Sequence, residues 1–247
     1  MTERPATVRP RHRMVDRVSG ILEFAARSDG VSLTEIARHV GAPVSSVQGL
    51  VNGLVATGYL DERARVYRLG VGPYFLNLLA GRGAVNRIVH DDLVQLHEKT
   101  GSTSVVLAVA VGSDVVYIDH VSDDPHTAYL AERFLRRSLI RTSTGWVLMA
   151  DWEPRDLWAY LETLEADDQP RVTKLLDHLE SIRATDMSVL PDIAEDPDLD
   201  GISIAVRERG RVVAAVGVVG RRSELARNRD RIVDALRAQA RDWDRRG

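Results

Sequence analysis

Residues 32–58 read SLTEIARHVGAPVSSVQGLVNGLVATG, and this segment predicts the architecture of the first part of the chain. Ser32 and Glu35 match a capping box, in which a hydroxyl and a carboxylate three residues apart bond free backbone N–H groups at a helix start. The predicted helix covers Leu33–Val40 and ends at Gly41. The segment therefore opens with a short, capped helix.

A second short helix is expected soon after the first. Ser45 and Gln48 repeat the capping-box spacing, and apolar residues then keep helical spacing up to Thr57. Gly58 supplies the residue type that commonly follows a helix end. Two such helices, joined by about four residues that include glycine, have the layout of a helix-turn-helix.

The flanking residues extend this unit in both directions. Residues 1–13 carry prolines among basic residues and are interpreted as a basic, flexible arm. From Met14 apolar residues recur at helical spacing until Asp29-Gly30. After the second helix, Tyr59-Leu60 and Val66–Leu69 flank the polar turn Asp61–Arg65, which predicts a β-hairpin, or wing. Residues 14–70 are thus predicted to be a winged helix-turn-helix domain.

The remainder of the chain predicts a linker and a larger α+β domain with an antiparallel sheet. Residues 71–84 are read as a linker with a short helix at Pro73–Ala80, and residues 85–247 as the second domain, beginning with a helix at Asn86–Thr100. Two β-branched runs, Ser104–Val111 and Asp114–Val121, flank Gly112-Ser113 and predict a hairpin. The other expected elements are strands at Thr127–Ala131, Ser138–Arg141, Ile202–Val206 and Val212–Val219, and helices at Gly145–Asp151, Pro154–Glu165, Pro170–Arg183 and Ser223–Arg245.

Composition excludes several classes of protein. The chain has 247 residues, 44% of them hydrophobic, and contains no cysteine, which excludes a disulfide scaffold, a cysteine nucleophile and a thiolate metal site. Its longest apolar run, Val105–Val111, is too short to span a membrane, and the first residues do not resemble a signal peptide, so a cytoplasmic protein is expected. Residues 1–70 carry a net charge of +3 and residues 71–247 of −6. A basic head on an acidic body is a weak indication of nucleic-acid binding.

The order and spacing of apolar and turn residues from about residue 14 to 245 resemble the IclR-type bacterial transcriptional regulators. In the head the matching residues are Val18, Ile21, Leu22, Leu33, Glu35, Ile36, Ala37, Gly41, Pro43, Ser45, Val47, Leu50, Leu54, Gly58, Tyr59, Tyr67, Leu69 and Gly70. In the body they are Thr100-Gly101, Val115–Ile118, Thr142–Gly145, Leu148–Ala150 and Gly210–Ala215.

This resemblance implies a winged helix-turn-helix, a linker helix and a GAF-like effector-binding domain. It implies homodimers, possibly paired into tetramers, that bind a double-stranded DNA operator. It also implies control by a small effector, commonly an organic acid. The family pattern usually has Gly-Lys where this chain has Gly145-Trp146, and serines near Gly217 and Val219, so the effector is expected to differ.

The predicted recognition helix carries polar side chains but no lysine or arginine. Its first turns are expected to face the major groove, where Gln48 and Asn52 can pair with adenine and Val44 can touch a thymine methyl group. Ser45 and Ser46 are further candidates for base contacts. The alternative is that Ser45 only caps the helix and that Ser46 only touches a phosphate. Basic side chains elsewhere must then supply phosphate contacts; the candidates are Arg11, Arg13, Arg17, Arg38, Arg63, Arg65 and Arg68.

The segment Arg141–Trp146 is the candidate effector site. Thr142, Ser143 and Thr144 precede Gly145 at a predicted helix start, where free N–H groups and hydroxyls attract a carboxylate and Arg141 offers a charge. An ordinary N-cap is the alternative. Trp146 is proposed as an aromatic wall, with core packing as its alternative. The site is completed by Ser203, Gly217 and Val219, the last two leaving apolar room for an aromatic carboxylate such as a hydroxybenzoate.

No residue pattern predicts catalysis, a metal site or a cofactor. The seven histidines are scattered, and Asp119, His120 and Ser122 are too close along one strand to form a catalytic triad. The favoured reading is a ligand-responsive, DNA-binding regulator without enzymatic activity. The alternative is an enzyme or metabolite-binding protein whose winged helix mediates only protein contacts.

Overall fold

The computed structural model describes residues 12–80, 88–101, 104–123 and 136–246. It divides into two compact units, Arg9–Arg82 and a larger unit that includes Gly83–Gly247. This division falls within the predicted linker. Residues 1–11 of the expected arm, the start of the helix predicted at Asn86 and the strand predicted at Thr127–Ala131 lie outside the described residues. Arg13, which was assigned to the arm, begins the first helix.

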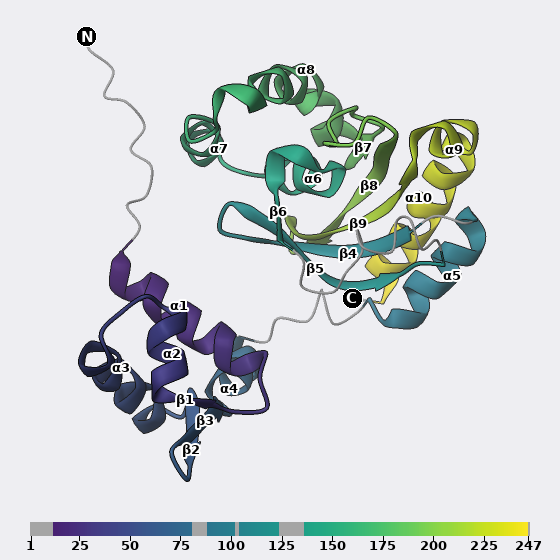
Figure 1. Ribbon diagram of the computed structural model, residues 1–247. Helices are drawn as coiled ribbons and strands as arrows, with labels where there is room; N and C mark the ends of the chain where they lie inside the picture. The colour runs from purple at the N-terminus through teal and green to yellow at the C-terminus, as the bar shows by residue number, and fades with distance from the viewer. Residues whose placement is uncertain (1–11, 81–87, 102–103, 124–135, 247) are drawn as a thin grey trace. The chain divides into compact units, whose positions relative to one another are not determined.

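Residues 13–69 of the N-terminal unit form three helices and a small sheet (Figure 1). The helices are α1 (Arg13–Ala26), α2 (Leu33–His39) and α3 (Val44–Ala56), and the strands are β1 (Val31–Ser32), β2 (Leu60–Arg63) and β3 (Val66–Leu69). The sheet is antiparallel in the order β1-β3-β2. The predicted winged helix-turn-helix is confirmed, with β1 as an additional strand and a turn of only two residues between β2 and β3.

Capping explains the start of α2 but not of α3. Ser32 Oγ accepts from the Glu35 N–H, and the Ser32 N–H donates to Glu35 Oε2 at 2.8 Å, so the first capping box is confirmed. The second prediction is wrong, because α3 begins at Val44 after Pro43 and has no side-chain cap. Because Pro43 occupies the N-cap position, Ser45 lies inside the first turn of α3 and is not the capping residue.

After β3 the chain enters α4 (Gly72–Ala80), which confirms the predicted linker helix. This helix is apolar but largely uncovered: Tyr74 is 63% exposed, Phe75 55%, Leu76 50% and Leu79 66%. An exposed run of large apolar side chains is unusual on a free surface and indicates a surface that binds a partner.

The C-terminal unit is built on one antiparallel sheet of six strands, in the order β6-β5-β4-β9-β8-β7. The helices α6, α7 and α8 cover one face and α5, α9 and α10 the other (Figure 1). The strands are β4 (Ser104–Val111), β5 (Asp114–Val121), β6 (Arg136–Ser138), β7 (Met187–Val189), β8 (Leu199–Glu208) and β9 (Arg211–Arg221). The helices are α5 (His90–Thr100), α6 (Ser143–Ala150), α7 (Pro154–Leu161), α8 (Gln169–Thr185), α9 (Arg222–Arg227) and α10 (Arg229–Arg245).

The alternation of side chains along β4 produces two hydrophobic cores. Val106 and Ala108 pack beneath α6, whereas Val105 and Leu107 pack against α5 and α10. This confirms the predicted α+β class. Three details differ: β7 was not predicted, the strand expected at Ser138–Arg141 is the end of β6 followed by a 3₁₀ turn at Leu139–Arg141, and the terminal helix is broken at Asn228.

Gly145 allows α6 to pack directly on the 3₁₀ turn, since a Cβ atom there would lie 2.1 Å from the Leu139 carbonyl oxygen. We expect Gly145→Ala to lower the free energy of unfolding by about 1–3 kcal/mol, as overpacked core positions do. Gly53→Ala is the matched control: Gly53 lies inside α3 with nothing within 4 Å of the added atom, so alanine should stabilise by about 0.5–1 kcal/mol. Urea unfolding of both variants measures the difference, and equal stabilities would contradict this packing.

Candidate nucleic-acid interface and ligand cavity

The exposed surface of α3 presents the side chains predicted to meet DNA. Val44 is 44% exposed, and Ser45, Ser46 and Asn52 are also exposed. Gln48 is half-buried, and its Nε2 donates to Asn52 Oδ1 at 2.8 Å. This hydrogen bond lies one turn along the helix and pre-orients the two amides, the groups that pair with base edges.

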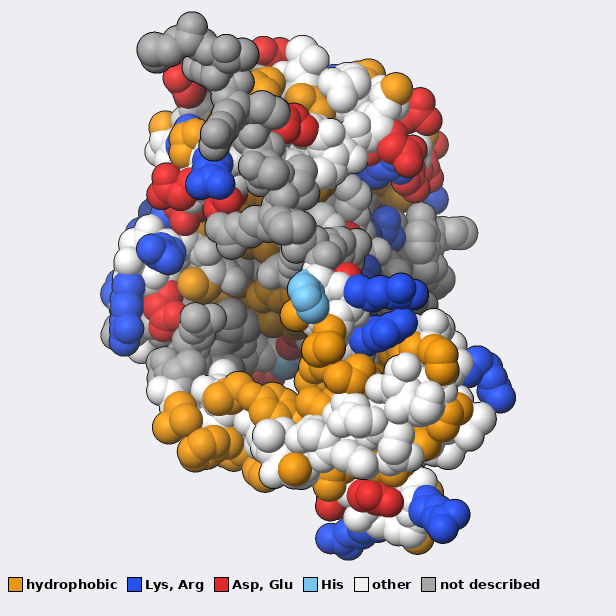
Figure 2. Space-filling model, turned by 90° about the vertical axis from the view of Figure 1, so that its left-hand side faces the viewer, with side chains coloured by type: hydrophobic (Ala, Val, Ile, Leu, Met, Phe, Trp, Pro, Cys, Tyr) orange, Lys and Arg blue, Asp and Glu red, His pale blue; other side chains and the backbone are white. Residues whose placement is uncertain are grey.

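The predicted phosphate-binding arginines do not share one environment. Arg38 on α2 is exposed, and Arg63 is 82% exposed beside Asp61 at 3.5 Å. Arg65 is in the two-residue turn between β2 and β3. By contrast, Arg68 donates from Nε to the Asp29 carbonyl at 2.6 Å and so ties β3 to the end of α1. The tip of the hairpin formed by β2 and β3 is the lowest part of the view in Figure 2, which shows basic and acidic side chains together there.

Arg13 and Arg17 line a small cavity of about 310 Å³ next to the turn that follows α2. His39 also lines it and stacks on Phe24, with ring centroids 4.3 Å apart. Arg13, a predicted contact to DNA phosphates, thus lies beside the helix-turn-helix. Arg11 lies outside the described residues.

The larger unit contains a cavity of about 720 Å³ between β5, β6, the N-terminal turn of α6 and the loop before β8. Of the predicted effector residues, Arg141, Thr142, Ser143 and Val219 line it. Its apolar lining comes from Leu164, Ile193 and Leu199 as well as Val219. The cavity is large enough for a small organic molecule. Its other lining residues are mostly polar or charged, and they include the carboxylates of Glu165, Asp168, Glu195, Asp196 and Asp200.

Arg141 does not offer an unpaired charge to this cavity. Its Nε lies 3.0 Å from Asp168 Oδ1, and Glu195 binds Nη1. These two carboxylates raise the pKa of Arg141, with the Asp168 hydrogen bond as the largest cause. Thr142 likewise has a structural role, since its hydroxyl accepts from the Gly145 N–H as the N-cap of α6.

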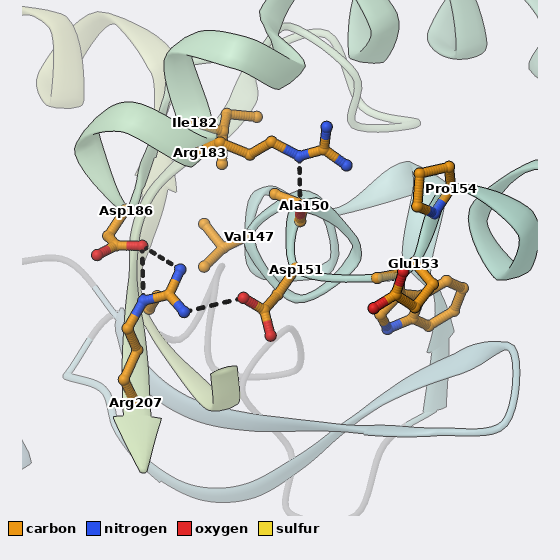
Figure 3. A pocket seen from close by; sticks show the side chains of 11 residues that line it. Val147, Ala150, Asp151, Glu153, Pro154, Ile182, Arg183, Asp186 and Arg207 are labelled. Atoms are coloured by element: carbon orange, nitrogen blue, oxygen red, sulfur yellow. Dashed lines mark hydrogen bonds and ion pairs between the residues drawn. The ribbon is translucent and has the colours of Figure 1, made fainter. Parts of the chain in front are cut away.

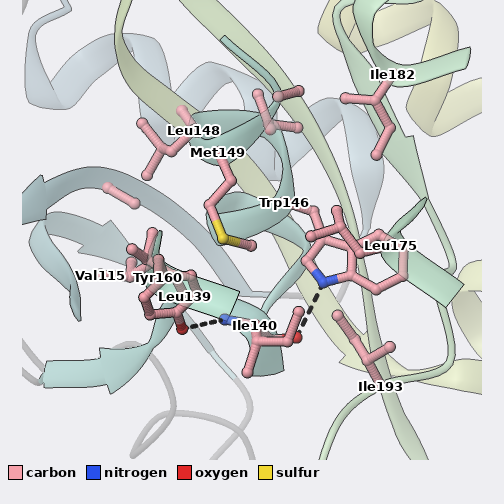
Figure 4. Packing of buried hydrophobic residues seen from close by; sticks show 14 of the residues in the cluster. Val115, Leu139, Ile140, Trp146, Leu148, Met149, Tyr160, Leu175, Ile182 and Ile193 are labelled. Carbon is pink, nitrogen blue, oxygen red and sulfur yellow. Dashed lines mark hydrogen bonds between the residues drawn. The ribbon is translucent and has the colours of Figure 1, made fainter. Parts of the chain in front are cut away.

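Trp146 lies in the core, which is the alternative named for it above, and it does not line the 720 Å³ cavity. The side chain is fully buried, and its Nε1 donates to the Ile140 carbonyl at 2.9 Å (Figure 4). It lies among apolar residues of α8 and the 3₁₀ turn and does not line the cavity.

The space at Gly217 is already filled by the protein. A Cβ atom at Gly217 would lie 2.7 Å from Thr144 Cγ2 and 2.9 Å from Ser203 Oγ. Ser203 is fully buried and shares a 2.7 Å hydrogen bond with Ser143. These contacts join α6 to the sheet. Four residues expected to contact the effector do not line this cavity, namely Thr144, Gly145, Ser203 and Gly217.

Sequence reasoning missed most of the polar residues of the cavity, among them Tyr117, Arg137 and Ser138. Arg137 Nε is buried, and among the described residues it has no hydrogen-bond partner. Burial raises the pKa of the Tyr117 phenol, which keeps it protonated as a donor. Arg137 had no recognisable signal, because it lies outside the segment identified from the helix start.

A separate cavity of about 300 Å³ lies at the other end of α6 (Figure 3). Arg207 is paired within it, donating to Asp186 and to Asp151, both at 2.8 Å, and Arg183 Nε donates to the Ala150 carbonyl at the end of α6. Asp186 and Asp151 raise the pKa of Arg207. These contacts hold β8 against the ends of α6 and α8.

Among the described residues, no helix has the length and apolar character needed to cross a bilayer, and no three histidine or acidic side chains are grouped to hold a metal ion.

Comparison with curated proteins found a relative in Paracoccus denitrificans, the HTH-type transcriptional regulator BhcR. It is 26% identical over 202 residues, which cover 80% of this chain and 65% of the relative. The chain thus spans less than two thirds of the length of the curated relative that it matches.

Several solved structures share the fold. An IclR homolog from Microbacterium hydrocarbonoxydans, crystallised with 4-hydroxybenzoate, is 21% identical with a TM-score of 0.66, covering 93% of this chain and 97% of that chain. A putative IclR regulator from Silicibacter sp. TM1040 is 23% identical with a TM-score of 0.68, covering 94% of this chain and 95% of that chain.

Family models match both parts of the chain. The IclR helix-turn-helix model matches residues 14–64, and the model of the C-terminal domain of bacterial IclR transcriptional regulators matches residues 81–245. These ranges contain the α3 surface and the 720 Å³ cavity described above. The protein is therefore a member of the IclR family of bacterial transcriptional regulators.

Proposed function

We propose that this protein is a sequence-specific DNA-binding regulator whose affinity for its operator is set by a small organic acid, an aromatic carboxylate. The observation that carries the proposal is the presence of two candidate sites on one chain. One is an exposed helix with paired amides, and the other is a 720 Å³ cavity with an arginine at its wall. No catalytic step is assigned to either site.

The α3 surface supports operator recognition. Gln48 and Asn52 present amides for adenine, while Val44 is placed to touch a thymine methyl group. Arg13, Arg38, Arg63 and Arg65 supply charge around this uncharged helix, and Arg11 is proposed to add to it. Phosphate contacts by such arginines give salt-dependent affinity, and base contacts give specificity.

Arg137 and the α6 N-terminus support binding of a carboxylate. Arg137 Nε lacks a partner in the described protein, so a bound anion would satisfy it. The positive end of the α6 dipole and the hydroxyls of Tyr117 and Ser138 add further attraction. Leu164 and Ile193 provide apolar walls for a ring.

Calorimetric titration with 4-hydroxybenzoate tests the effector half of the proposal. This acid is chosen because the Microbacterium hydrocarbonoxydans homolog was crystallised with it. We expect binding that Arg137→Gln weakens by about tenfold or more, since an ion-paired hydrogen bond contributes about 1.5–3 kcal/mol. Arg155→Gln, at an exposed arginine of α7 that does not line the cavity, is the control and should bind nearly as the wild type does. Binding of an aliphatic acid alone would exclude the aromatic class.

The exposed apolar surface of α4 supports a homodimer as the DNA-binding form. Burying Phe75 and Leu79 against a second copy would remove two side chains, each more than half exposed, from water. Two copies would also place two α3 helices against two half-sites of a palindromic operator, and a pair of such dimers is the proposed route to a tetramer.

We therefore expect Leu79→Glu to shift the protein toward monomer in light scattering after size-exclusion chromatography. Asn77→Glu adds the same charge at an exposed polar position of the same helix and should leave the mass unchanged. A stable dimer in both variants would place the interface elsewhere.

A further inference from the structure

A third cavity of the larger unit, of about 330 Å³, lies at the free edge of the sheet. Strand β7 forms its floor, and residues of α8 and α10, which cover opposite faces of the sheet, form its sides. It shares no lining residue with the 720 Å³ cavity. It is therefore a separate site and does not depend on the function proposed above.

The lining of this edge cavity is basic. Arg229 and Arg237 lie eight residues apart on one side of α10, and His178 reaches it from α8. No carboxylate is found among its described lining residues. Arg229 is within 3.0 Å of its exposed neighbour Asp230, whereas no ion pair of Arg237 is formed within the described chain. The unbalanced charge favours an anion.

Ser188 gives the independent sign of a missing ligand. It lines the cavity and is only 2% exposed, yet its Oγ has no hydrogen-bond partner in the described part of the protein. A buried hydroxyl left without a partner is destabilising, and a bound acceptor would remove that cost.

The backbone of β7 adds donors at the same place. The Ala205 N–H donates to Asp186 O, and the Leu190 N–H donates to Gly201 O, across the pair of strands β7 and β8. Because hydrogen-bonding groups alternate along an antiparallel strand, the N–H groups of Met187 and Val189 point to the open edge. These amides face the cavity side of the sheet edge rather than another strand.

We propose that this edge cavity binds a small carboxylate with a short apolar body. The carboxylate is held by Arg237 and the Ser188 hydroxyl, with Arg229 as a second cation. The body packs on Ile182, Met187 and Val233, which also line the cavity and make it unsuited to a fully hydrated ion such as inorganic phosphate.

Methyl NMR of the full chain labelled at methionine tests this site directly. The chain has four methionines, of which Met187 lines the edge cavity and Met149 is buried in the core beneath α6. Titration with pentanoate and benzoate, up to about 20 mM to saturate a millimolar site, is expected to shift the Met187 signal and leave Met149 nearly unchanged. Inorganic phosphate should shift it less.

Variants separate this site from the larger cavity. Arg237→Gln is expected to weaken the Met187 response roughly tenfold or more, whereas Arg241→Gln, an exposed arginine one turn further along α10, should not. Ser188→Ala should weaken binding without lowering the melting temperature, because the hydroxyl it removes is unpaired. Arg137→Gln should leave the Met187 response intact.

Two results would overturn the proposal. One is a Met187 signal that neither carboxylate shifts. The other is a shift that persists in Arg237→Gln or disappears in Arg137→Gln, since either would trace the response to another site.

Discussion

Replacing Trp146 by alanine is expected to lower the free energy of unfolding by about 3–5 kcal/mol. The indole is fully buried among residues of α8 and the 3₁₀ turn, beside the His178 ring at a centroid distance of 5.9 Å. Its removal leaves a large void and also leaves the Ile140 carbonyl without its 2.9 Å donor. Since α6 joins the cavity to the sheet, the loss of this anchor should also weaken ligand binding.

Trp158→Ala is the matched control for this substitution. Trp158 lies on α7 of the same unit but is 48% exposed, so its loss should cost much less. Trp146→Phe should fall between the two, because it keeps most apolar contact and loses only the donor. Chemical unfolding followed by circular dichroism measures all three. Equal losses for Trp146→Ala and Trp158→Ala would return Trp146 to the list of candidate effector contacts.

A variant carrying both Gln48→Ala and Asn52→Ala is expected to lose most discrimination between operator and unrelated DNA. Each good amide–adenine pair is worth about 1–3 kcal/mol, so specificity should fall by about tenfold or more. The two side chains are joined at 2.8 Å, so removal of either also frees the other, and the single variants should not be additive. The salt dependence of binding should stay unchanged, because no charge is removed.

Arg63→Gln is the complementary variant on the exposed wing. It should weaken binding to all sequences alike and reduce the slope of log affinity against log salt by about 1. Fluorescence anisotropy with labelled duplexes at several salt concentrations distinguishes the two effects. Full discrimination by the double variant would show that Gln48 and Asn52 do not read the operator. A wild-type protein without salt-dependent DNA affinity would instead favour the alternative of a winged helix used only for protein contacts.

Local patterns in the sequence predicted the elements well where a local interaction sets them. The Ser32–Glu35 capping box acts within one turn and is present as predicted. The Ser45 cap failed because Pro43 starts the helix two residues earlier. Strand β7 has only three residues and no alternation long enough to recognise.

The candidate ligand site was harder to predict because its contacts join distant segments. Arg141 looked available in the sequence, but its partners Asp168 and Glu195 lie far along the chain. Gly217 looked like open space, but Thr144 fills it from α6. Arg137 became a candidate only once the fold placed it at the cavity with an unpaired Nε.

The most direct test of this account is the affinity of the full-length protein for DNA from upstream of its own gene, measured with and without saturating 4-hydroxybenzoate. An effector acts only through a difference in its affinity for two states of the protein, so a bound acid that controls the regulator must change DNA affinity. We predict a change of about 5- to 150-fold, the usual range of such coupling, that is lost in Arg137→Gln. Saturation of the cavity with no change in DNA affinity would contradict the account.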